Sequence, residues 1–202
     1  MSRTKAGRIE RGQIGRIAFN DLDAIARALD GQLGLDFRWR GEALDRLIDE
    51  RHAALVDAIV QIFLRAGWEV DVEVSFSIYG ERGSIDVFAR HPPTGLVAVV
   101  EVKASIGEAG GTLIGVDRKA RLAPAIARER GWRCTGVARI LVVVEGNTAR
   151  DRINRHREAF RSALPSTTRE CLAWIRDPSS PPPAGILFIG PRNVRGVRKT
   201  GQ

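Results

Sequence analysis

The chain contains two apolar stretches with embedded charges, Gly83-Ser84-Ile85-Asp86 and Val99-Val100-Glu101-Val102-Lys103. Between them lies His91-Pro92-Pro93-Thr94-Gly95, which is rich in turn-forming residues. The pattern predicts two antiparallel strands joined by this turn. In a simple hairpin about Pro93 and Thr94, the numbers of paired residues add up to 187, so Asp86 lies opposite Glu101.

The same hairpin places Ser84 opposite Lys103. Since side chains alternate along a strand, Asp86, Glu101 and Lys103 are expected to share one face of the hairpin. The other face is expected to hold Ile85, Val87, Val100 and Val102.

Two carboxylates that face each other across neighbouring strands repel, unless a cation lies between them. Mg²⁺ or Mn²⁺ prefers such hard oxygen ligands, and Lys103 beside them could orient a water and offset charge on a phosphate. The plainer alternative is an exposed hairpin face with a Glu–Lys pair. Apolar residues surround Glu101 as in a central strand, where unused charges are costly, and this favours a metal site.

Hydrophobic periodicity predicts an α/β (α+β) fold with a mixed central sheet flanked by helices. We expect a small helical segment at 1–40, with a helix at 21–29 capped by Asn20 or Asp21, a main domain at 41–190 and a basic tail at 191–202. In the main domain we expect helices at 41–67, 117–130 and 148–164, a glycine-rich loop at 107–115, and strands at 70–78, 84–90, 96–104, 139–145, 171–175 and 185–189.

The Asp86…Glu101-Val102-Lys103 pattern after a long helix resembles the PD-(D/E)xK nuclease superfamily, and most of all its Holliday-junction-resolvase-like branch. Ile85 stands where the family name has proline. The resemblance implies a restriction-endonuclease-like αβββαβ core. It also implies that Asp86, Glu101 and the backbone carbonyl of Val102 bind the metal, and that Lys103 is the catalytic lysine.

Many members of this superfamily add an acidic residue or a histidine from the first helix. The candidates here are Glu50, His52 and Asp57, and the sequence does not choose among them. His52 lies on the apolar stripe of its helix, where a packed core histidine is the alternative. Glu73 shares the active face only in one strand register, and Glu81 is expected in a turn beside Asp86.

The chain has 202 residues and a formal net charge of +8, and only four of its 32 basic residues are lysines. This excess of positive charge favours DNA as a partner, although a solvated basic surface is the alternative. Candidate phosphate contacts are Lys119, which the resemblance suggests, and Arg150, Arg157 and Arg161 on an arginine-rich helix.

Residues 7–34 resemble the second half of a Cro/XRE-type helix-turn-helix, with Ile9-Glu10-Arg11-Gly12 at the end of its recognition helix. Half a domain cannot bury its own core, which argues against sequence-specific reading by this segment. A simple helical arm is the alternative.

Several classes are excluded or disfavoured. No apolar run approaches the roughly 20 residues of a membrane span, and the two cysteines form no metal or disulfide motif, so a cytoplasmic protein is expected.

The sequence predicts an Mg²⁺-dependent deoxyribonuclease. The alternatives are a non-catalytic DNA-binding regulator of XRE type, which uses the nuclease-like fold for binding or dimerisation, and a basic RNA-binding protein. The number of subunits is left open, with a homodimer among the alternatives.

Overall fold

A computed structural model describes Gly7 and residues 18–31, 42–179 and 181–190. The chain divides into two compact units, residues 1–41 and 42–202. The basic tail predicted at 191–202 lies outside the described residues, and so do residues 8–17 and 32–34 of the segment with helix-turn-helix resemblance, which include Ile9-Glu10-Arg11-Gly12.

The larger unit is an α/β fold built on a five-stranded mixed sheet with strand order β1-β2-β3-β4-β5. The first three strands pair antiparallel, and β3, β4 and β5 pair parallel. The mixed sheet predicted from the sequence is therefore confirmed. The strands are β1 (Glu69–Ile78), β2 (Glu81–His91), β3 (Leu96–Lys103), β4 (Gly136–Val144) and β5 (Ala184–Ile189).

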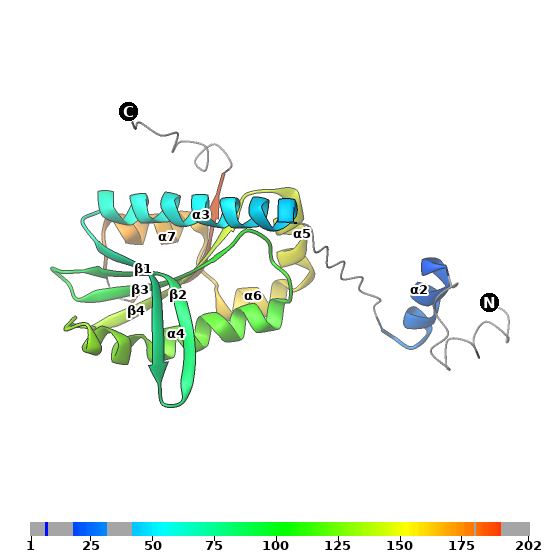
Figure 1. The fold of residues 1–202 in the computed structure, drawn as a ribbon, viewed down its shortest axis with the longest axis horizontal. Helices are drawn as coiled ribbons and strands as arrows, with labels where there is room; N and C mark the ends of the chain where they lie inside the picture. The colour runs from blue at the N-terminus through cyan, green and yellow to red at the C-terminus, as the bar shows by residue number, and fades with distance from the viewer. Residues whose placement is uncertain (1–6, 8–17, 32–41, 180, 191–202) are drawn as a thin grey trace. The chain divides into compact units, whose positions relative to one another are not determined.

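One face of the sheet is covered by α3 (Glu42–Arg65) and α7 (Thr168–Arg176) (Figure 1). Trp68, which follows α3, stands between them and donates from its indole nitrogen to the Ile175 carbonyl at 2.9 Å. Its ring also lies 5.1 Å from the ring of Trp174. This aromatic contact joins the two helices through their buried sides.

The opposite face is covered by α4 (Ala109–Glu129) and α6 (Arg157–Ala163), with α5 (Asn147–Arg155) leading into α6. In α4, Leu122 and Ile126 pack on Val97 and Val99 of β3. Since β3 has α3 on one side and α4 on the other, it is buried along nearly its whole length, as expected of a central strand.

The β1–β2 hairpin bends sharply where Glu73 of β1 faces Asp86 of β2. Glu73 has a φ of 51°, in the left-handed region, and neither residue belongs to the ladder that continues on both sides of them. Beyond the bend the hairpin turns away from β3 and crosses over α4 (Figure 1).

The predicted β2–β3 register is confirmed from His91↔Leu96 to Val87↔Val100. The ladder ends at Val87↔Val100. The expected pairings of Asp86 with Glu101 and of Ser84 with Lys103 are both absent from the ladder, because β2 leaves β3 at the bend. Ile85 is also on the other face from the one expected, since it packs in the cluster on the α4 side.

Three predicted elements, a loop, a helix and a strand, are corrected. The glycine-rich loop is wrong beyond Glu108, because this residue caps α4 by accepting from the backbone nitrogens of Gly110 and Gly111, so both glycines are helical. The single helix at 148–164 is broken at His156. The strand expected at 171–175 is part of α7, which begins with a capping box formed by Thr167 and Glu170.

In the smaller unit, α2 (Phe19–Ala28) begins two residues before the predicted helix. Its N-cap is Ala18, so Asn20 and Asp21 lie inside the helix and the predicted cap is wrong. An ion pair of 3.0 Å between Arg27 and Asp23 stabilises its exposed side. Among the described residues, no helix combines the length and the apolarity that crossing a membrane requires.

Candidate active site

The candidate site is a cluster of four charged side chains at the bend of β2, which we call the charged cluster: Asp86, Glu101, Lys103 and Lys119. Glu101 and Lys103 are two residues apart on β3, so both face α4. Lys119 comes from α4 on the same side. The four side chains of the charged cluster thus come from the central strand β3, from α4, which covers it, and from the bent neighbouring strand β2.

Asp86 takes the place of a strand partner for β3. Its Oδ2 accepts a hydrogen bond of 2.6 Å from the backbone nitrogen of Val102, just beyond the last β2–β3 pair. The N–H and C=O of one residue point toward the same neighbouring strand, so the Val102 carbonyl is directed to the Asp86 side as well. The bend therefore brings a carboxylate and a backbone carbonyl to one edge of β3.

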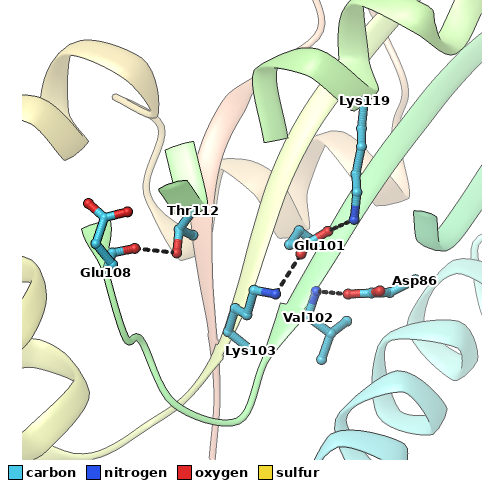
Figure 2. A network of polar contacts seen from close by, with 7 residues as sticks. All are labelled: Asp86, Glu101, Val102, Lys103, Glu108, Thr112 and Lys119. Carbon is cyan, nitrogen blue, oxygen red and sulfur yellow. Dashed lines mark hydrogen bonds and ion pairs between the residues drawn. The ribbon is translucent and has the colours of Figure 1, made fainter. Parts of the chain in front are cut away.

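Glu101 lies between two lysines (Figure 2). The Lys103 Nζ is 2.7 Å from Oε1, and the Lys119 Nζ forms an ion pair with Oε2. Glu101 and Lys119 are only 6% and 8% exposed, so neither charge could remain without a close partner of opposite sign. The Lys103 side chain is far more exposed, at 38%, and can reach solvent.

The two carboxylates respond in opposite directions to this environment. Burial raises the pKa of Asp86, and the hydrogen bond from Val102 offsets part of the rise, whereas the charge of Glu101 adds to it. Burial would also raise the pKa of Glu101, but the hydrogen bonds and charges of Lys103 and Lys119 outweigh it, and the pKa is lowered. Asp86 is thus the carboxylate that gains most from an additional cation.

None of the three candidates on the first helix joins Asp86 and Glu101 in a metal-binding group among the described residues. His52 is half-buried on α3, and it is the last of several groups whose electrostatic influence lowers the pKa of Asp86. Glu50 and Asp57 are exposed on α3. The other acidic candidates lie differently: Glu73 is exposed at the bend, and Glu81 begins β2 and pairs with Arg121 at 2.7 Å.

The candidate phosphate contacts are not gathered in one place. Lys119 belongs to the charged cluster and is buried against Glu101. Arg150 forms two hydrogen bonds with Glu145 and lies 4.7 Å from the centre of the Phe188 ring. Arg157 and Arg161 are exposed on α6.

Sequence reasoning missed two features of the site. The first is the ion pair between Lys119 and Glu101. The available signal was that the chain has only four lysines among its 32 basic residues, so a lysine within a predicted helix was itself unusual. The second is a pocket of about 290 Å³ beyond the ends of β3 and β4, where ligands often bind in open α/β sheets. Its lining includes Arg51, Ser105, Asn147 and Arg152, and Arg152 donates to the Ile106 carbonyl.

The oxygen donors of the cluster are of the kind that hard divalent cations prefer, namely two carboxylates and a backbone carbonyl. A third acidic or histidine ligand is not grouped with them: across residues 18–31, 42–179 and 181–190, no three His, Cys, Asp or Glu side chains meet as a metal-binding group. Any cation bound here would therefore need water or substrate oxygens to complete its shell.

In comparisons with known proteins, no family model matches this chain and no curated protein is detectably similar to it. A pair of carboxylates with unequal pKa, beside an ammonium that can reach solvent, is suited to charge-assisted hydrolysis of an anionic substrate.

Proposed function

We propose that this protein is a metal-dependent deoxyribonuclease that hydrolyses phosphodiester bonds at the charged cluster. The observation that carries the proposal is the convergence of Asp86, the Val102 backbone and the Glu101–Lys103 pair at one bend of the sheet. Asp86 and Glu101 bind Mg²⁺ or Mn²⁺, with the Val102 carbonyl as a further oxygen ligand. Lys103 assists the attack of water.

The order of elements supports this assignment. Residues 42–144 run α3-β1-β2-β3-α4-β4, which is the αβββαβ order of the restriction-endonuclease-like core in the PD-(D/E)xK superfamily. Asp86 lies on the second strand of this core and Glu101-Val102-Lys103 on the third. These are the positions on which the resemblance in the sequence rests.

The proposed chemistry follows from the charges. A divalent cation held by the two carboxylates would supply Lewis-acid assistance to a phosphodiester. Asp86 and Glu101 fix the position of that charge, and Lys103, which is partly exposed, faces the entering phosphate. In the reaction the oxygen of water bonds to phosphorus and one ester P–O bond breaks. The products are a phosphomonoester and a free hydroxyl. The Lys103 ammonium offsets the negative charge that builds up on the phosphate oxygens.

DNA is the proposed substrate, and the cytoplasm the proposed location. The net charge of +8 favours association with a polyanion, and exposed arginines such as Arg157 and Arg161 are available to contact phosphates elsewhere along a nucleic acid. His52 is the proposed first-helix contributor, because it is half-buried on α3 whereas Glu50 and Asp57 are exposed.

The test is a cleavage panel with the full chain on supercoiled, linear and branched DNA, in Mg²⁺, in Mn²⁺ and in chelator. We expect strand cleavage that requires a divalent cation and falls at least about a hundredfold in Asp86→Asn. Asp117→Asn is the matched control, because it removes a carboxylate that only pairs with Arg139 on the exposed side of α4. Equal activity of wild type and Asp86→Asn would contradict the assignment.

One observation favours the second candidate, a non-catalytic DNA-binding regulator. Both oxygens of Glu101 form ion pairs with lysines, so the charge of this carboxylate is already balanced by neighbouring side chains. A binding module would retain DNA affinity in chelator and cleave nothing in any metal. The same panel, read with a DNA-binding assay, therefore separates the two functions.

A further inference from the structure

We propose that Lys119 is a positioning residue that couples metal binding to substrate binding. Its ammonium forms an ion pair with Glu101 and repels a divalent cation at the same carboxylate. Asp86 and Glu101 therefore hold such a cation tightly only when a negatively charged phosphodiester binds together with it. This inference rests on the proposed function and extends it, because it predicts when the site can be loaded.

The charge balance of the cluster is the first step of the argument. With both carboxylates ionised, Asp86 and Glu101 carry two negative charges, and Lys103 and Lys119 carry two positive charges. A dication that enters this neutral cluster gains the attraction of the carboxylates but meets the repulsion of two ammonium groups within a few ångströms. The ligand-free cluster is therefore a weak site for a cation alone.

The two lysines differ in how easily they can move away. The Lys103 side chain is 38% exposed and can turn to water. Lys119 is buried where α4 packs on β3, and only 8% of its surface is accessible. An ammonium at this depth stays near Glu101, because leaving its partner without reaching water is costly. Lys119 thus acts as a permanent counter-charge.

A phosphodiester supplies the missing negative charge. Each phosphate that approaches the cluster attracts both lysines and the bound cation, so the cation and the nucleic acid strengthen each other's binding. By thermodynamic linkage, the factor by which DNA tightens cation binding equals the factor by which the cation tightens DNA binding. Without Lys119 the cluster would carry a net negative charge, and it would bind the cation tightly even when no substrate is present.

The experiment measures Ca²⁺ affinity of the full chain by calorimetry, alone and with a saturating short DNA duplex whose integrity is checked on a gel. Ca²⁺ is the probe because it takes the same oxygen ligands. For the wild type we expect DNA to tighten Ca²⁺ binding by about tenfold or more, in the range typical of coupled sites. For Lys119→Met we expect Ca²⁺ alone to bind about tenfold more tightly, and the effect of DNA to shrink toward none.

The matched control is Arg121→Gln. It removes one positive charge from the same helix, but from a side chain that pairs with Glu81 and not with Glu101. Its Ca²⁺ affinity and its coupling to DNA should equal those of the wild type. If both substitutions raise the affinity equally, the effect comes from net charge and the role of Lys119 is refuted.

The remaining outcomes separate this inference from the proposed function. If Ca²⁺ binds wild type equally well with and without DNA, or if Lys119→Met changes neither value, the coupling is refuted and the nuclease assignment stands. If no Ca²⁺ binds under any condition, the metal site itself is refuted. Should Lys119→Met fail to fold, Lys119→Gln keeps a hydrogen bond to Glu101 without the charge and decides the question with the same expected values.

Discussion

Removal of the Glu101 charge should destabilise the protein strongly, because it leaves a buried ammonium without its partner. In Glu101→Gln the shape is nearly unchanged, but Lys119, at 8% exposure, faces a neutral amide. Lys103 is exposed enough to turn to water, so the loss comes from Lys119. Breaking a buried ion pair in this way costs about 3–5 kcal/mol. In a domain of this size the melting temperature should fall by roughly 6–20 °C.

A double-mutant cycle tests the origin of that loss. Lys119→Met alone leaves Glu101 paired with Lys103, so we expect a smaller cost of about 1–2 kcal/mol. Glu101→Gln with Lys119→Met removes both buried charges and fills the space with an apolar chain, which should recover most of the stability lost in Glu101→Gln. The coupling energy between the two positions should be at least about 2 kcal/mol.

The assay is urea unfolding at neutral pH without divalent metal, followed by circular dichroism, with Arg121→Gln as a surface control within about 0.5 kcal/mol of wild type. Two results would refute the reasoning. One is a loss below about 1 kcal/mol in Glu101→Gln, which would mean that the pair is solvated. The other is a double variant whose losses simply add, which would mean that the two charges do not interact.

Three further predictions use the same unfolding measurement. Asp86→Asn should stabilise the metal-free protein at neutral pH, because the folded state raises the pKa of Asp86 above its ordinary value of 3.8. The gain should vanish as the pH falls through the raised pKa to 3.8, and a gain in stability that persists in acid would contradict this prediction. Gly185→Ala should cost about 1–3 kcal/mol, since the new Cβ would lie 2.5 Å from the Cys171 sulfur; an unchanged stability would show that the contact relaxes. Thr167→Ala should cost about 1 kcal/mol by removing the capping box with Glu170, and Thr167→Asn should restore most of it.

The parts of the fold that the sequence predicted correctly are those set by local patterns. The β2–β3 register followed from the turn at 92–95, where Gly95 adopts a φ of 72°. The long first helix and the central strand followed from their apolar periodicity. Together these placed Asp86 near Glu101 before any tertiary contact was known.

The errors arose where local patterns are ambiguous. A short apolar run such as Cys171–Ile175 suits either a strand or a helix, and the capping box at Thr167 and Glu170 was the local feature that could have decided for a helix. Glycines normally weaken a helix, but Gly110 and Gly111 leave room for the Glu108 carboxylate that caps α4. Neither outcome follows from periodicity.

Two features of the site depend on tertiary packing. The bend at Glu73 and Asp86 redirects the hairpin over α4, and nothing in the alternating pattern of β1 marks it. The ion pair between Lys119 and Glu101 exists because α4 packs on that face of β3, eighteen residues further along the chain. Sequence reasoning could therefore name the residues of the site, but not the internal balance of its charges.

The most direct test of the central claim is an anomalous difference map from crystals of the protein with DNA and Mn²⁺. We predict a peak at the bend of β2, about 2.0–2.3 Å from oxygens of Asp86 and Glu101, with a DNA phosphate beside it and Lys103 turned toward that phosphate. An ordered DNA with no peak between these carboxylates, or with its phosphates away from the charged cluster, would contradict the account.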